Sequence, residues 1–333
     1  MATANVAVEA VGLVKSFGTF RAVDGVDLAI RQGEIFGVLG PNGAGKTTML
    51  KMLATLLSID EGEARIFGID VACEPHRVRQ LVGVTGQYAS VDEDLTASEN
   101  LWLFGRLQGL RSRDARATAT RLLEQFGLEE AAGRPLSKFS GGMRRRLDLA
   151  ASLITRPPLI FLDEPTTGLD PRTRGQMWET IRGLVADGCT VLLTTQYLDE
   201  ADQLADRIAV IDRGRKVAEG TPDELKLSVG DSTLQLQLAA DADQGLACDV
   251  VRRVVGVEPV LEADSGRMTV ALEVPDAAGD VLIGLRQAGV GITSVSVAKP
   301  TLDEVFLALT GHDTGQPEST VETMDDVFEE VAS

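Results

Sequence analysis

The sequence lacks the features of a membrane-spanning, a disulfide-bonded or a nucleic-acid-binding protein. No apolar run reaches the roughly 18 residues that a helix needs to cross a bilayer. Cys73, Cys189 and Cys248 are scattered, so they give neither a disulfide framework nor a metal-binding spacing, and we expect plain thiols. Bases are outnumbered, with 32 Lys and Arg against 50 Asp and Glu. The resulting net charge of −18 argues against nucleic acid as the main partner.

The acidic charge also bears on how the chain could reach a membrane. It disfavours direct docking on anionic lipid, whereas the cytoplasmic loops of membrane proteins are rich in Lys and Arg. An acidic subunit would complement such loops. Residues 1–5 lack a basic stretch followed by an apolar core, so we expect no secretory signal and a chain that stays in the cytoplasm.

What is present begins with a glycine-rich segment that follows a short apolar run, residues 34–39, which fits a buried parallel strand. The segment reads Gly40-Pro41-Asn42-Gly43-Ala44-Gly45-Lys46-Thr47-Thr48. Its glycines let backbone N–H groups converge on phosphate oxygens, Lys46 supplies a charge to the outer phosphates, and Thr47 offers a hydroxyl to Mg²⁺. Residues 49–54 then open a helix, whose N-terminus also favours an anion. The sequence therefore predicts a phosphate loop.

Two carboxylates follow a second apolar run, residues 159–162. Asp163 and Glu164 then lie at the carboxyl end of a buried strand, the edge where open α/β sheets bind ligands. Asp163 is the candidate Mg²⁺ partner, and Glu164, which points elsewhere, can polarise an attacking water. The alternative is an ordinary helix start. The phosphate loop favours the catalytic interpretation.

A third peptide, Phe139-Ser140-Gly141-Gly142-Met143, precedes an arginine-rich stretch. Residues 140–156 have helical spacing, with Ser140 as the cap and two glycines that leave the first N–H groups unobstructed. The amino end of this helix is an anion site without a lysine. The alternative is a capped surface helix.

These peptides together resemble those of ATP-binding cassette (ABC) proteins, in which Ser140 to Met143 would be the signature peptide. The resemblance implies an α/β P-loop NTPase with a mixed sheet core, a helical subdomain and an antiparallel β subdomain. It implies ATP and Mg²⁺ as cofactors, and a second copy of the chain, because the family's signature peptide closes on the γ-phosphate of the opposite subunit. Met143 stands where the family usually has Gln, but this change removes no backbone N–H.

The resemblance also assigns roles to single residues. Phe17 stands where the family places an aromatic that stacks on adenine, with a packed core residue as the alternative and Phe20 as a weaker candidate. Gln87 matches the glutamine that touches Mg²⁺ and water and senses the membrane partner. Asp170 lies in the turn that connects the two nucleotide sites across a dimer. Gln196 replaces the histidine that usually follows the strand at residues 190–195.

An amide at position 196 can donate a hydrogen bond to phosphate but cannot carry a positive charge or shuttle a proton. We expect Gln196 to keep a positioning role and Glu164 to activate water. The alternative is a hydrolytically crippled site that works as a slow switch.

The chain divides into a cassette over residues 1–228 with its helical subdomain at about 88–156, a small C-terminal domain over 229–312, and an acidic tail over 313–333. In the C-terminal domain, alternating and helical patterns suggest a ferredoxin-like α+β module that serves interaction or regulation. Residues 300–311 form a marked helix with a capping box. The tail is expected to be disordered, with a docking helix as the alternative.

Residues 86–96, 196–202 and 300–311 resemble the daunorubicin-resistance branch of ABC exporters. The branch implies an ATPase subunit that homodimerises and drives efflux of an anthracycline-like compound through a separate polytopic membrane permease, at the cytoplasmic side of the membrane. A groove with acids at residues 92–94 and 99 beside Trp102 and Phe104 would suit a basic helix of that permease, with a solvated acidic loop and core aromatics as the alternative. The alternatives are a soluble ABC ATPase and a nucleotide switch without transport.

Overall fold

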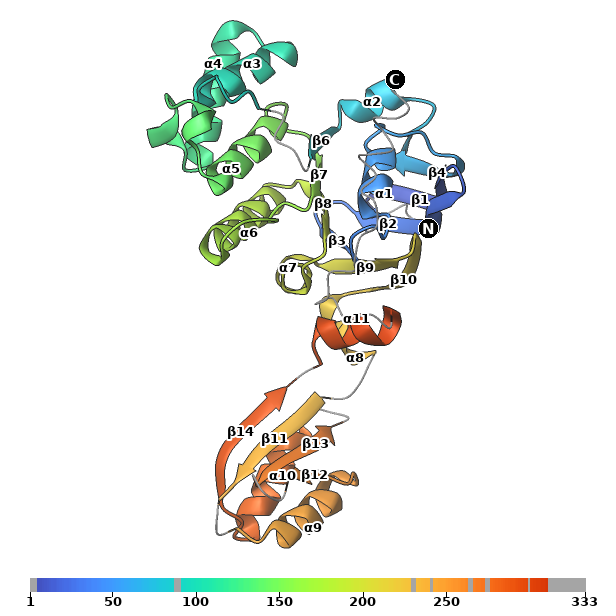
Figure 1. Cartoon of the computed structure of the whole chain (residues 1–333), viewed down its shortest axis with the longest axis vertical. Coiled ribbons are helices and arrows are strands. Elements are labelled where there is room, and N and C mark those ends of the chain that lie inside the picture. Colours follow the sequence, from blue (N-terminus) through green and yellow to red (C-terminus); the bar gives the residue numbers. More distant parts are fainter. Residues whose placement is uncertain are drawn as a thin grey trace.

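The computed structural model describes residues 5–86, 91–228, 232–239, 242–262, 266–272, 276–298 and 300–310 (Figure 1). In this part of the chain, no helix is both long and apolar enough to span a membrane. Gln87 and the tail at residues 313–333 lie outside the described residues.

The central sheet is built around β3 (Ile35–Leu39), whose five residues are all buried. It pairs in parallel with β8 (Thr190–Thr195) and β9 (Arg207–Asp212). The remaining strands are β7 (Leu159–Asp163), β6 (Val82–Thr85) and the antiparallel edge strand β10 (Arg215–Gly220), in the order β10-β9-β3-β8-β7-β6. Since β3, β6, β7, β8 and β9 run the same way, their carboxyl ends meet at one edge, where a ligand site is expected.

A second, antiparallel sheet covers one side of this core. Its order is β2-β1-β4-β5, with β1 (Val6–Phe17), β2 (Phe20–Arg31), β4 (Glu61–Ile66) and β5 (Ile69–Asp70). Helix α1 (Lys46–Leu53) lies between the two sheets, since its Met49 and Leu50 share one apolar cluster with residues of both. Helix α2 (Pro75–Arg79) leads from β5 to β6.

The helical subdomain forms a separate lobe of the cassette (Figure 1). It contains α3 (Ala97–Leu107), α4 (Ser112–Gln125), α5 (Gly141–Ser152) and two short 3₁₀ turns, Glu129–Ala131 and Leu136–Lys138. A capping box begins α3, where Thr96 and Glu99 each bond the other's backbone. Leu122 and Leu147 belong to the same apolar cluster as Leu193 of β8, so the lobe packs onto the sheet. Helices α6 (Pro171–Ala186) and α7 (Leu198–Leu204) follow.

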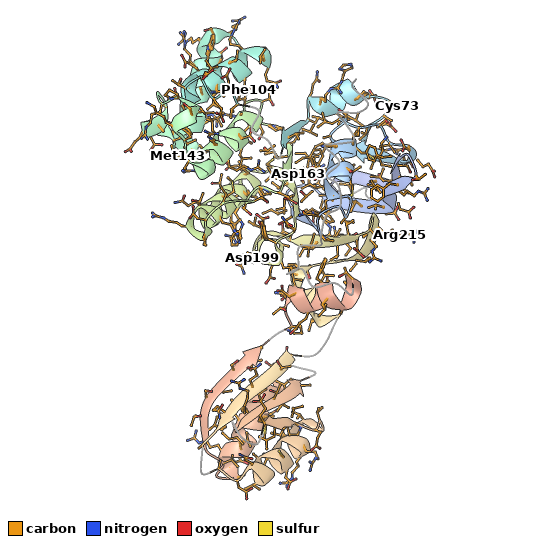
Figure 2. The ribbon with its side chains drawn as sticks, viewed as in Figure 1. Cys73, Phe104, Met143, Asp163, Asp199 and Arg215 are labelled. Atoms are coloured by element: carbon orange, nitrogen blue, oxygen red, sulfur yellow. The ribbon has the colours of Figure 1, made fainter. Side chains whose placement is uncertain are left out.

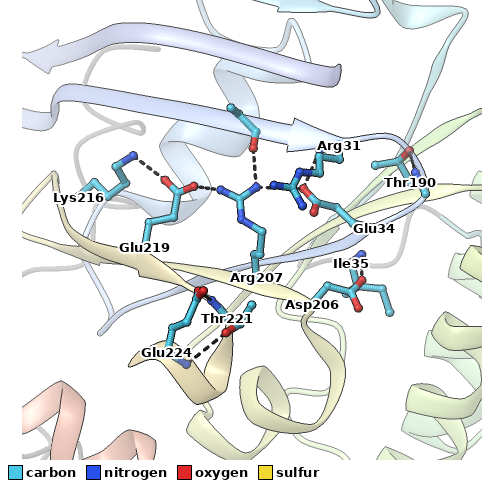
Figure 3. A network of polar contacts seen from close by, with 12 residues as sticks. Arg31, Glu34, Ile35, Thr190, Asp206, Arg207, Lys216, Glu219, Thr221 and Glu224 are labelled. Atoms are coloured by element: carbon cyan, nitrogen blue, oxygen red, sulfur yellow. Dashed lines mark hydrogen bonds and ion pairs between the residues drawn. The ribbon is translucent and has the colours of Figure 1, made fainter. Parts of the chain in front are cut away.

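An ion-pair network connects β9 and β10 of the central sheet to β2 of the antiparallel sheet (Figure 3). Arg207 of β9 contacts Glu34, Glu219 and the backbone carbonyl of Ala29, and its guanidinium lies 5.4 Å from the centre of the Phe36 ring. Because Glu34 and Glu219 are largely buried, removing Arg207 would leave two carboxylates without this partner, which is costly.

The C-terminal unit has the strand and helix order that the sequence predicts. After α8 (Pro222–Leu227) it runs through β11 (Ser232–Leu238), α9 (Gln244–Val255), β12 (Val260–Glu262), β13 (Arg267–Leu272), α10 (Ala277–Gln287) and β14 (Ile292–Ala298). The antiparallel order β12-β13-β11-β14 is that of a ferredoxin-like sheet. The three-residue strand β12 is the element that the sequence patterns do not locate.

The last helix, α11 (Leu302–Thr310), packs on the cassette. Leu302, Val305 and Phe306 share an apolar cluster with Leu198 of α7 and Ile208 of β9. Thr301 and Glu304 form the expected capping box, with bonds of 3.1 and 3.3 Å. The division at residue 229 stays a prediction, and this helix, although it falls in the predicted C-terminal domain, contacts the cassette.

Candidate nucleotide-binding site

The phosphate loop lies between β3 and α1, and close backbone approaches require its glycines. A Cβ on Gly40 would lie 2.3 Å from the carbonyl oxygen of Ile211. A Cβ on Gly45, whose φ is 101°, would lie 2.2 Å from that of Ala22. Gly40 N–H also donates to the Thr195 carbonyl at 3.2 Å, which ties the start of the loop to the end of β8. The loop is therefore preshaped by its neighbours.

Lys46 is almost fully buried, with 4 % of its surface exposed, at the start of α1. Its ammonium donates to the carbonyls of Gly40 at 2.8 Å and Pro41 at 3.0 Å, and lies 3.5 Å from Oε1 of Glu164. Burial lowers the pKa of Lys46, and the charge of Glu164 opposes that shift. An anionic ligand would supply the negative charge that this buried ammonium favours.

Asp163 and Thr47 meet in the way the sequence predicts, although 116 positions separate them. The Thr47 hydroxyl donates to Oδ1 of Asp163 at 3.0 Å, and the Thr194 hydroxyl donates to the same oxygen at 2.5 Å. The described residues contain no group of three or more His, Cys, Asp or Glu that could hold a metal. Mg²⁺ nevertheless fits, because it takes few protein oxygens and completes its shell with phosphate and water.

Glu164 has an unusual backbone conformation and is held from several sides. Its φ is 47°, in the left-handed region that a residue with a side chain rarely adopts. Its N–H donates to the Thr194 carbonyl at 3.1 Å and lies 3.2 Å from the Thr194 hydroxyl. Oε2 accepts from the Thr167 hydroxyl at 3.2 Å. The carboxylate thus faces Lys46, and Asp163 faces Thr47.

Gln196 follows β8 directly and is half-buried. It lines an open surface pocket with Tyr197, Leu198, Asp199 and Asp303 of α11. The preceding Thr195 carbonyl is the one that accepts from Gly40, so Gln196 lies one residue beyond a direct link to the phosphate loop.

The peptide at residues 140–143 begins α5, in the helical lobe. Ser140 caps the helix by accepting from Met143 N–H at 3.3 Å, and a Cβ on Gly142 would lie 2.3 Å from Cγ2 of Thr173. Figure 2 shows Met143 in that lobe and Asp163 in the core of the cassette. Within one chain, the structure does not bring this peptide to the phosphate loop.

Phe17 and Asp170 have local partners. Phe17 is half-buried at the end of β1, opposite Phe20 at the start of β2, and the ammonium of Lys15 lies 5.8 Å from its ring. Asp170 caps α6 by accepting from Thr173 N–H at 3.0 Å, and hydrogen bonds from Thr173 lower the pKa of this carboxyl.

Three residues near the site were missed by the sequence analysis. Thr194 makes hydrogen bonds to both Asp163 and Glu164. Arg145 of α5 donates to the backbone carbonyls of the same two residues. Glu200 is fully buried and bonds Thr166, in the segment that follows Glu164. Glu200 accepts from Thr166 Oγ1 at 2.8 Å and Trp178 Nε1 at 3.2 Å, and burial raises its pKa. A Thr-Thr pair ending a strand could have pointed to Thr194, but no local signal points to the other two.

A phosphate loop between a parallel strand and a helix, with two carboxylates at the end of β7 close to Lys46 and Thr47, defines a P-loop nucleotide-binding cassette. Solved structures agree. An ATP-binding cassette of an ABC transporter in its ADP conformation matches with a TM-score of 0.61 and 26% identity, covering 66% of this chain and 92% of that one. A dimeric ATP-binding cassette bound to ADP and Pi matches with a TM-score of 0.59 and 28% identity, over 64% and 98%.

Family models identify the chain more closely. One described as ABC transporter matches residues 23–167, and one described as the C-terminal domain of ATP-binding protein DrrA1-3-like matches residues 220–310. The daunorubicin resistance ATP-binding protein DrrA2 of Streptomyces coeruleorubidus is 52% identical over 316 residues, which cover 94% of this chain and 98% of that protein. The doxorubicin resistance ATP-binding protein DrrA of Mycobacterium tuberculosis is 44% identical over 306 residues, covering 90% and 92%.

The chain therefore belongs to the ABC transporter ATP-binding proteins, in the branch of the DrrA-like drug-resistance proteins. It binds ATP or ADP, and ATP hydrolysis is its enzymatic activity.

Proposed function

We propose that two copies of this chain pair head to tail over two MgATP molecules and drive efflux of a hydrophobic, anthracycline-like compound through a separate membrane subunit. The pairing is supported by one observation. Within one chain, the peptide that begins α5 lies apart from the site formed by Lys46, Thr47, Asp163 and Glu164. A second copy would bring its peptide to the open side of the phosphates. The names of the relatives support the class of compound.

In this proposal each side chain has a role that follows from its chemistry. Lys46 and the loop N–H groups bind the outer phosphates, and Phe17 stacks on adenine. Thr47 and Asp163 would hold Mg²⁺, which supplies neutralisation of phosphate charge when bound. Glu164 accepts a proton from the attacking water.

The remaining assignments also stay proposals. Asp170 contributes to the contact between copies, and Gln87 would reach metal and water. The amino end of α5, residues 140–143, would complete the partner's site through backbone N–H groups.

Gln196 should position phosphate through its amide. Gln196→Ala is expected to lower ATP turnover about tenfold or more, because a hydrogen bond to a charged group contributes roughly 1.5–3 kcal/mol. Gln196→His should keep most of the activity and add a dependence on pH near the ordinary histidine pKa of about 6.5. Steady-state turnover of both variants measures this, and an alanine variant as fast as the parent would exclude the role.

The contact with the membrane subunit is proposed at the helical lobe. Asp92, Glu93 and Asp94 are exposed there. On α3, Trp102 and Phe104 are half-buried; Trp102 Nε1 donates to the Ser112 hydroxyl at 3.3 Å, and Phe104 packs against the apolar cluster of the lobe. This surface suits a short basic amphipathic helix, and it agrees with a net charge of −18. The chain would then be peripheral at the cytoplasmic side of the membrane.

Co-expression with a candidate membrane permease tests the transport proposal. Cells carrying both proteins should accumulate less anthracycline than cells carrying the membrane protein with the Glu164→Gln variant. The chain should also co-purify with the membrane protein. Equal accumulation in the two strains, or an active ATPase that never associates with membranes, would favour the soluble alternative.

A further inference from the structure

Arg145, on the first turns of α5, makes hydrogen bonds that join the helical lobe to the nucleotide site. Its side chain is 14% exposed. Nη1 donates to the Gly86 carbonyl at 2.6 Å, and Nη2 donates to the carbonyls of Asp163 at 2.6 Å and Glu164 at 3.0 Å. Nε donates to the Pro165 carbonyl at 3.1 Å. One guanidinium thus binds the backbone at the ends of both β6 and β7.

This arrangement requires an arginine. The guanidinium is planar and presents five donors in a fixed fork, so it can reach several carbonyls at once, whereas lysine offers a single ammonium. Burial lowers the pKa of Arg145, with Asp148 and Asp163 among the carboxylates that oppose the shift. Arginine stays protonated in proteins despite such a shift, so all five donors remain available.

Arg145 bonds the backbone of Glu164, a residue in a strained conformation. Glu164 has a φ of 47°, a conformation that persists only where the surroundings over-determine it. The Thr194 carbonyl accepts from the N–H of Glu164, and Arg145 donates to the carbonyl of Glu164. The peptide groups on both sides of the Glu164 Cα are therefore held by hydrogen bonds. Thr194 belongs to β8 and Arg145 to α5. The orientation of the Glu164 side chain therefore depends on the positions of both elements.

We propose that Arg145 is a positioning residue that fixes the Glu164 carboxylate for water activation and makes that geometry depend on the seating of α5. This inference rests on the proposed catalytic role of Glu164. Since residues 140–143 form the amino end of α5, with Ser140 as its cap, the helix that would complete the partner's nucleotide site also positions Glu164 in its own chain.

The neighbouring arginines provide a matched control. Arg144 pairs with Glu93 at the surface of the lobe. Arg146 donates to the Phe126 carbonyl at 3.1 Å, within the lobe. The three consecutive arginines therefore bind different partners, and Arg145 is the one that bonds the backbone of Asp163 and Glu164.

The test compares Arg145→Lys and Arg145→Gln with Arg144→Gln. Misplacing a catalytic group by about 1 Å can cost 10²-fold, so kcat should fall about 10- to 100-fold in both Arg145 variants, while the Kd for ATP changes less than about twofold. Arg144→Gln should keep kcat. Thermal unfolding shows whether each variant is folded. Unchanged kcat, equal losses in kcat and ATP affinity, or failure of both Arg145 variants to fold would overturn the proposal.

A double-mutant cycle separates this inference from the role of Glu164. In single-turnover assays, Arg145→Lys should slow the parent but add little to Glu164→Gln, because both changes act on one carboxylate. Additive effects would show that Arg145 acts elsewhere. If Glu164→Gln itself leaves turnover unchanged, the proposed function fails, whereas a slow Glu164→Gln beside a normal Arg145→Lys contradicts the positioning role alone.

Discussion

Replacing Glu164 with Gln should lower ATP turnover by about 10²- to 10⁴-fold, the usual contribution of a general base. The amide has the shape of the carboxylate but cannot take a proton from water. ATP binding should survive, because Lys46 keeps its bonds to the carbonyls of Gly40 and Pro41 and loses the charge of one neighbour.

Phosphate release and equilibrium ATP binding, measured on the same preparation, test this prediction. Glu179→Gln is the matched control, since Glu179 is an exposed residue of α6 paired with Arg182. The control should keep full turnover. A Glu164→Gln variant within about threefold of the parent would mean that another group activates water.

Replacing Lys46 with Ala should weaken ATP binding by about 2–5 kcal/mol, at least 30-fold in Kd, because truncating one partner of a buried charge pair has a cost of this size. The ammonium is buried among loop carbonyls and lies 3.5 Å from Glu164. Its removal takes away the buried cation at the phosphates, so turnover should be lost at ordinary ATP concentrations.

Titration with a fluorescent ATP analogue measures the affinity. Lys51→Ala is the control, because Lys51 lies on the exposed side of the same helix α1. It should bind ATP as the parent does. An Lys46→Ala variant with parental affinity would contradict the assignment of the phosphate loop.

The sequence predicts best where the chemistry is local. The phosphate loop, the two carboxylates after β7 and the Ser140 cap each lie within a few residues of the strand or helix that places them. The order of strands and helices along the chain follows from the same patterns, apart from the three-residue strand β12.

The features that could not be predicted from the sequence depend on contacts between segments that are distant along the chain. Arg145 binds carbonyls, which carry no side-chain signature, at the ends of β6 and β7. Glu200 is buried behind Thr166, 34 positions away, although charged residues are seldom fully buried. The capping box of α11 is visible in the sequence, but its packing against α7 and β9 is not.

The most direct test of head-to-tail pairing mixes two variants that should each be inactive alone. Lys46→Ala removes the phosphate-binding charge. Gly141→Asp places a negative charge at the amino end of α5, where a Cβ meets no atom within 4 Å and folding should be preserved. In a mixed pair, the intact phosphate loop of one copy faces the intact peptide of the other, so one of two sites is complete.

ATP turnover of the equimolar mixture is the deciding measurement. With random pairing, half of the dimers are mixed and hold one complete site, so turnover should rise to about one quarter of the parental value per chain. Turnover no higher than the sum of the two separate preparations would contradict a nucleotide site shared between two copies.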